Sequence, residues 1–92
     1  SSGCILEGAT LVNCVISYRV VVHKNAEVEN SIIFEHVNIG KNSKIKNCII
    51  DKNVRIGDNV KIGFDKEHDK ARGFTVSENG ITVVPMNLTI NH

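Results

Sequence analysis

The chain lacks several features that mark other classes of protein. It has no tryptophan and one proline, and aromatic residues make up only 4% of its 92 residues. No apolar run reaches the roughly 18 residues that span a bilayer, and the start at Ser1–Cys4 has neither the basic nor the apolar region of a secretory signal. Charges nearly balance, with 11 basic and 10 acidic residues. We therefore expect neither nucleic acid nor a membrane as a partner.

Cysteine is also scarce. The three cysteines are an odd number without C-x-x-C spacing, which signals neither a disulfide framework nor a zinc site. A reducing, cytoplasmic setting is the expected location. Cys14 and Cys48 are expected in the core, and Cys4 is the candidate for a reactive thiol. Because the chain does not begin with methionine, we expect it to be part of a longer protein.

What the chain does have is isoleucine and valine at regular intervals. Large aliphatic residues follow one another at spacings of 6, 5 and 6, which together make a 17-residue period. No amphipathic helix gives these spacings without filling the intervening i+3 and i+4 positions. The members are Ile5, Leu11, Ile16, Val22, Val28, Ile33, Ile39, Ile45, Ile50, Ile56 and Ile62.

A second set of positions supports a β structure. Two residues before each aliphatic stands a small or β-branched residue, and a separation of two places both side chains on one face of a strand. These residues are Gly3, Ala9, Cys14, Val20, Ala26, Ser31, Val37, Ser43, Cys48, Val54 and Val60. The pattern predicts an all-β fold, a single-stranded parallel β-helix of 17-residue coils with three short strands each. Stacking the coils gives ribs of like residues, such as Ile5, Val22, Ile39 and Ile56.

The corners of the predicted coils carry their own signal. Asparagine and glycine recur at the 17-residue period, and both tolerate the left-handed backbone of a tight corner. One column is Gly8, Asn25, Asn42 and Asn59, and another is Asn13, Asn30 and Asn47.

The pattern changes after residue 63. We expect coils in residues 1–63 and a C-terminal cap of the same domain in residues 64–92. Asp65 can cap a short helix over 65–72, with Gly73 beyond its end. Residues 74–84 predict a hairpin around Asn79–Gly80, which Pro85 ends. The first coil has no comparable cap, so we expect a partner domain there.

Motifs for chemistry are absent. The four histidines have no metal-ligand spacing, and neither a catalytic, a cofactor nor a metal site is predicted. Basic residues gather in the later coils among interleaved acids, which is typical of a solvated face. The alternative is an anion site, for which Lys52 is the first candidate as an effector-binding residue.

Particular stretches resemble a known family. They are Ser2–Ile5, Asn47–Lys52, Val60–Gly63, Asp69–Phe74, Ser77–Ile81 and Val83–Val84. Together they resemble the C-terminal domain of bacterial glucose-1-phosphate adenylyltransferase (ADP-glucose pyrophosphorylase), and the resemblance covers nearly the whole chain. It implies that the β-helix is left-handed and that this chain alone is not an enzyme, because catalysis belongs to an N-terminal nucleotidyltransferase domain.

The resemblance also implies a role. The family makes ADP-glucose from ATP and glucose 1-phosphate for glycogen biosynthesis. Its β-helix contacts the catalytic domain, helps to build a homo-oligomer, and contributes to binding phosphorylated-sugar effectors. Lys52 stands at the family's basic position after Asp51. Met86 and Ile90 stand in a region where the family has basic residues, a departure that weakens the case for activation by fructose 1,6-bisphosphate.

Two alternatives remain open at this point. The chain can be a stand-alone β-helix scaffold or oligomerisation module that is separate from any enzyme. The less favoured alternative is a small hexapeptide acyltransferase, which would form a trimer, bind an acyl-CoA and use His36.

Overall fold

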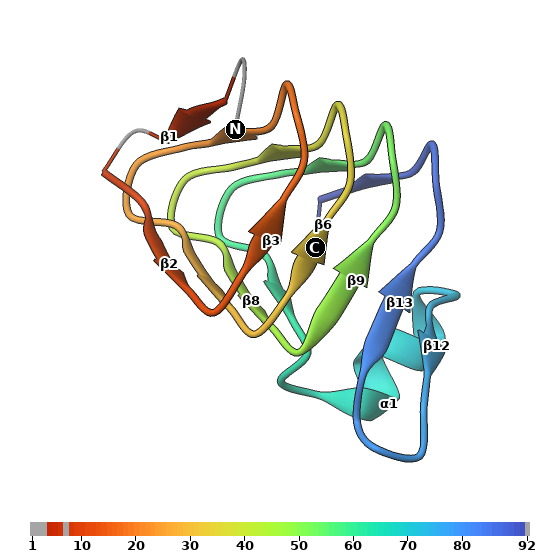
Figure 1. Ribbon diagram of the computed structural model, residues 1–92. Helices are drawn as coiled ribbons and strands as arrows, with labels where there is room; N and C mark the ends of the chain where they lie inside the picture. Colours follow the sequence, from red (N-terminus) through yellow and green to blue (C-terminus); the bar gives the residue numbers. More distant parts are fainter. Residues whose placement is uncertain (1–3, 7, 92) are drawn as a thin grey trace.

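The computed structural model describes residues 4–6 and 8–91, and the chain in it is wound into a three-sided β-helix (Figure 1). Each coil gives one short strand to each of three sheets. Sheet A contains, in spatial order, β1 (Ile5–Leu6), β4 (Val21–Val22), β7 (Asn38–Ile39), β10 (Arg55–Ile56) and β14 (Thr89–Ile90).

The other two sheets follow the same order of coils. Sheet B contains β2 (Thr10–Val12), β5 (Glu27–Glu29), β8 (Lys44–Lys46) and β11 (Lys61–Ile62). Sheet C contains β3 (Val15–Ile16), β6 (Ile32–Ile33), β9 (Cys48–Ile50), β13 (Thr82–Val84) and β12 (Thr75–Val76). Among the described strands, only the pair of β12 and β13 is antiparallel. The predicted fold class, a parallel β-helix of hexapeptide repeats, is confirmed.

The predicted ribs form the core. Val22 pairs with Ile39, and Ile39 pairs with Ile56, so each step along this rib is one period of the repeat. Val22 and Ile39 are 0% exposed, and Ile56 is 2% exposed. Burying such a side chain contributes about 1.5–3 kcal/mol. Because a single coil buries little by itself, this contribution depends on the neighbouring coils.

Polar groups inside the β-helix are satisfied between coils. Ser43 Oγ donates to the Gly57 carbonyl (2.6 Å) and accepts from the Val60 amide (3.2 Å). Ser31 Oγ donates to the Glu29 carbonyl and accepts from the Cys48 amide, at 2.8 and 3.2 Å. Burying these two serine hydroxyls therefore costs little free energy, because each donates one hydrogen bond and accepts another.

The corners have the left-handed backbone that was predicted. The φ angles are 64°, 63°, 61° and 58° along the column from Gly8 to Asn59, and 53°, 50° and 52° along the column from Asn13 to Asn47. The third corner has the same backbone, with φ of 59° at Asn53 and 61° at Asn87, but its first two residues suit that backbone less well: φ is 57° at Arg19 and 60° at His36. Residues other than glycine, asparagine and aspartate reach this region at a cost of about 1–2 kcal/mol.

The first coil departs from the predicted register. Leu6, not Ile5, pairs with Val22, while Ile5 pairs with Val21 and is 52% exposed. The reason is a shorter corner, because Leu6 comes two residues before Gly8, whereas Val22 comes three residues before Asn25. Cys4 then occupies the inward position that was predicted for Gly3, which lies outside the described residues.

The first coil also leaves an apolar end. Leu6 is 46% exposed although it belongs to an inward rib. A hollow of about 600 Å³ opens at this end, lined by Cys4, Leu6, Leu11, Asn13, Cys14 and Ile16. A partner domain at this end remains a prediction.

The segment after β11 is an insertion between two coils. Helix α1 (Lys66–Ala71) is capped by Asp65, whose side chain accepts from the Glu67 and His68 amides, and the hairpin of β12 and β13 follows. The strand β13 then pairs with β9, and β14 with β10. The coils therefore resume after the insertion. The sequence analysis had placed the coils in residues 1–63 and only a cap in residues 64–92, and did not predict this return. Within residues 4–6 and 8–91, no helix is long and apolar enough to cross a membrane.

Candidate functional site

Lys52, the predicted effector residue, lies at the corner that follows β9. Backbone hydrogen bonds place it in one column with Tyr18, Glu35 and Met86: the Asn53 amide donates to the Glu35 carbonyl and the Asn87 amide to the Lys52 carbonyl, both at 3.1 Å. Its side chain is 44% exposed, and its Nζ lies 3.9 Å from Asp51 Oδ1. Such an exposed ion pair is weak, so the ammonium group remains available to another anion.

A polar hollow lies beside this corner, on the outer surface of sheet A. It measures about 390 Å³ and is lined by Arg19, Val21, His36, Val37, Asn38, Asn53 and Arg55. None of these described lining residues is a carboxylate. Arg19 and Arg55 belong to coils two apart, which at about 4.8 Å per coil separates their backbones by roughly 10 Å.

This arrangement can bind an anion. Guanidinium groups present several N–H donors in a planar fork that matches carboxylate and phosphate oxygens. Asn53 and Arg55 follow Lys52 closely along the chain, so Lys52 stands beside the hollow, with Asp51 and Glu35 as its acidic neighbours at the corner. The sequence analysis chose Lys52 as the candidate and did not predict that Arg19 and Arg55 line the same hollow. The 17-residue period indicates that the two arginines are near each other. Arg55 lies two periods after Val21, and Val21 stands two residues after Arg19.

The histidines show no catalytic arrangement in the described structure. His36 is exposed at its corner, and its ring stands edge-on to Tyr18 with centroids 5.8 Å apart. His23 Nε2 lies 3.1 Å from Asn38 Oδ1 on the outer surface of sheet A. Among the described residues, no group of three or more histidine, cysteine or acidic side chains is placed to hold a metal ion.

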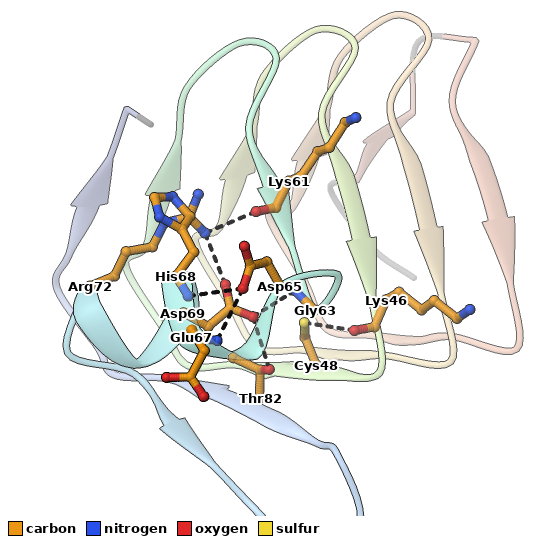
Figure 2. A network of polar contacts seen from close by, with 10 residues as sticks. All are labelled: Lys46, Cys48, Lys61, Gly63, Asp65, Glu67, His68, Asp69, Arg72 and Thr82. Carbon is orange, nitrogen blue, oxygen red and sulfur yellow. Dashed lines mark hydrogen bonds and ion pairs between the residues drawn. The ribbon is translucent and has the colours of Figure 1, made fainter.

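A buried ionic network fastens the insertion to the coils (Figure 2). Asp69 is 1% exposed and accepts from the Gly63 amide at 3.0 Å and from Thr82 Oγ1 at 3.3 Å. Arg72 Nη1 donates to Asp69 Oδ1 (3.1 Å) and to the Lys61 carbonyl (2.9 Å). The Arg72 side chain is 6% exposed, and burial lowers its pKa while Asp69 opposes that change. The network joins both ends of the insertion, so its role is structural.

Of the three cysteines, Cys48 is a core residue, and Cys4 and Cys14 pack against the core while partly buried. Cys48 is 1% exposed and donates from Sγ to the Lys46 carbonyl at 3.0 Å. Burial raises the pKa of its thiol to about 12, so the thiol stays protonated at neutral pH and is a poor nucleophile. Cys14 and Cys4 are half-buried, and their thiols donate to the Val28 and Ser17 carbonyls at 3.2 and 3.0 Å. The predicted core position of Cys48 is thus confirmed.

Comparison with known proteins agrees with this fold. Residues 1–84 match the family described as GlmU-like, C-terminal hexapeptide. The glucose-1-phosphate adenylyltransferase of Bifidobacterium animalis subsp. lactis is 58% identical over 91 residues, which cover 99% of this chain and 22% of that protein. The enzyme of the same name from Cutibacterium acnes is 41% identical over 90 residues, covering 98% of this chain and 22% of that protein.

A relative from Deinococcus deserti, again a glucose-1-phosphate adenylyltransferase, is 40% identical over 89 residues, or 97% of this chain and 22% of that protein. The chain thus spans about a fifth of the length of the curated relatives that it matches. The match includes the insertion with Asp69 and Arg72 as well as the repeats. The chain belongs to the GlmU-like C-terminal hexapeptide family and is homologous to a part of bacterial glucose-1-phosphate adenylyltransferases.

Proposed function

We propose that the chain is the non-catalytic β-helix module of a glucose-1-phosphate adenylyltransferase, serving assembly and the response to an effector. The observation that carries the proposal is the extent of the match, which takes in 99% of this chain but only 22% of a relative that is 58% identical to it. The remaining part of the enzyme, with ATP and glucose 1-phosphate as its substrates, is then a nucleotidyltransferase domain in the same protein. We place this protein in the cytoplasm, consistent with its free cysteines.

The effector in this proposal is a phosphorylated sugar. Its phosphate binds in the hollow on sheet A, where Arg19 and Arg55 supply guanidinium groups, and Lys52 adds a positive charge at the adjoining corner. The support is the polar lining of the hollow, which contains two arginines and His36 and no carboxylate among its described residues. Arg55 should matter more than Lys52, because Lys52 already faces Asp51 at 3.9 Å.

Titration calorimetry of the purified chain with two phosphorylated sugars, fructose 6-phosphate and fructose 1,6-bisphosphate, tests the effector role. We expect Arg55→Glu to weaken binding at least about tenfold, which corresponds to roughly 1.4 kcal/mol. Lys52→Glu should weaken binding by a smaller factor of about two to three. Both side chains are at the surface, so circular dichroism should show the parent fold in each variant.

Lys70→Glu is the matched control, because it makes the same reversal of charge on an exposed residue of α1. Its affinity should equal that of the parent chain. The effector role is refuted if the parent chain gives no binding heat with either sugar, or if Arg55→Glu binds as tightly as Lys70→Glu.

The alternative is a stand-alone scaffold that has been separated from its enzyme. The enzyme module and the stand-alone scaffold predict different coding sequences, because only the enzyme module requires a nucleotidyltransferase region in the same reading frame. Reading the coding sequence upstream of Ser1 separates them.

A further inference from the structure

The three outer surfaces of the β-helix differ in chemistry. Charged residues point outward from sheet B, as in the register pairs of Glu27 with Lys44 and Glu29 with Lys46. Sheet A carries Asn38 and Arg55. Sheet C instead has an apolar outward stripe along β3, β6, β9 and β13, consisting of Val15, Ile32, Ile49 and Val83.

Two residues of this apolar stripe, Val15 and Ile32, are exposed, and the other two, Ile49 and Val83, are half-buried. Val15 is 65% and Ile32 38% exposed, and beside them Phe34 is 41% and Ile81 37% exposed. The strands that carry the stripe lie side by side along the length of the β-helix (Figure 1). None of the four stripe residues is charged, and Asp51 borders the stripe one period after Phe34, where it faces Lys52 at 3.9 Å. A contiguous apolar surface with charges at its border is typical of a protein interface.

The residues at the corner beside the stripe indicate what kind of partner this surface binds. Along it stand Tyr18, Glu35, Lys52 and Met86, one per coil. The two charges therefore occupy the middle coils with opposite sign, and a large exposed apolar residue stands at each end, since Tyr18 is 48% and Met86 44% exposed. This order is self-complementary about a point between β6 and β9.

We infer that sheet C is the contact surface between two copies of this chain, related by a two-fold axis that runs parallel to the strands between β6 and β9. This axis places Glu35 of each copy opposite Lys52 of the other. It also places Ile32 opposite Ile49, and Val15 opposite Val83. A two-fold axis along the β-helix would instead set Glu35 and Lys52 against the corner of Asn30 and Asn47, which offers no charge. The inference rests on the assembly role in the proposed function and names its surface.

The size of the surface suits a dimer. The extents of the molecule are 32, 23 and 21 Å. One side of the molecule measures at most about 32 by 21 Å, so it can bury up to roughly 650 Å² per copy, or about 1,300 Å² in a pair, which is the lower end of the range of stable interfaces. The apolar end at the first coil is smaller, roughly 200 Å² for a triangle of that width, which is too little to hold two copies together by itself.

Sedimentation equilibrium of the purified chain tests this surface by charge reversal. The parent chain should be a dimer. Glu35→Lys or Lys52→Glu alone should raise the dimer dissociation constant at least about tenfold, because each places like charges opposite one another twice. The double variant Glu35→Lys with Lys52→Glu should restore the dimer, since the pairing is re-formed with the signs exchanged.

The control is the same double exchange on sheet B, Glu29→Lys with Lys46→Glu, together with its two single variants. These residues are also register partners one period apart, and none of the three variants should change the dissociation constant. A monomeric parent chain, unchanged dimers in the Glu35→Lys and Lys52→Glu single variants, or failure of their double variant to restore the dimer would overturn the inference. The calorimetry of Arg55→Glu is independent of this result, so loss of the dimer surface leaves the effector role standing, and the reverse holds too.

Discussion

Asp69→Ala should lower the free energy of unfolding by about 3–5 kcal/mol, because it leaves a buried guanidinium without its counter-ion. Asp69 is the partner of Arg72 at 3.1 Å, and the Arg72 side chain is only 6% exposed. The Arg72 Nε already lacks a hydrogen-bond partner among the described residues, so the remaining network cannot compensate. The Gly63 amide and Thr82 hydroxyl lose their acceptor as well.

Urea unfolding followed by circular dichroism measures this change. A loss of that size is a large part of the roughly 5–15 kcal/mol that stabilises a small domain. Glu67→Ala is the control, because Glu67 lies in the same helix with an exposed side chain and should change stability by less than about 0.5 kcal/mol. If Asp69→Ala and Glu67→Ala unfold at the same urea concentration, the network does not fasten the insertion.

Gly63→Ala should be nearly as damaging, for a steric reason. Gly63 has φ +91°, a region that L side chains rarely adopt, and a Cβ there would overlap the Lys46 carbonyl oxygen. The same Cβ would lie 2.9 Å from the Lys46 carbonyl carbon and 3.2 Å from Cys48 Sγ. Backbone strain and forced overlap together should cost about 3 kcal/mol or more.

Gly73 provides a control with the same backbone. Its φ is also +91°, but nothing lies within 4 Å of a Cβ built on it. Gly73→Ala therefore isolates the strain of the backbone, which should cost about 1–2 kcal/mol. Chemical denaturation of both variants gives the difference, which should exceed about 1 kcal/mol on this account. Equal midpoints for the two variants would contradict the close packing of β11 against β8 at Gly63.

The sequence indicated the coils correctly because each coil repeats the same environment. Val22, Ile39 and Ile56 occupy one rib, so a single repeat period sets strand register, inward side chains and left-handed corners together. The signal weakens where two apolar residues are adjacent. Ile5 and Leu6 satisfy the pattern equally well, and the length of the following corner decided which one points inward.

Other features depend on contacts between segments far apart in the sequence. The hairpin at β13 was predicted from its turn residues, but its return to sheet C beside β9 depends on Asp69, which bridges Gly63 and Thr82. The hollow on sheet A gathers Arg19, His36 and Arg55 from successive coils. Only reading the chain at the 17-residue period brings them together, whereas a search for local motifs does not.

The stacking of coils in this register is tested most directly by nuclear Overhauser contacts between methyl groups in the chain with labelled isoleucine and valine. The account predicts strong contacts from Ile39 to both Val22 and Ile56, its register partners in the coils on either side. Contacts from Ile39 to nearby Val37 and Ile45 alone, with none to Val22 or Ile56, would contradict it.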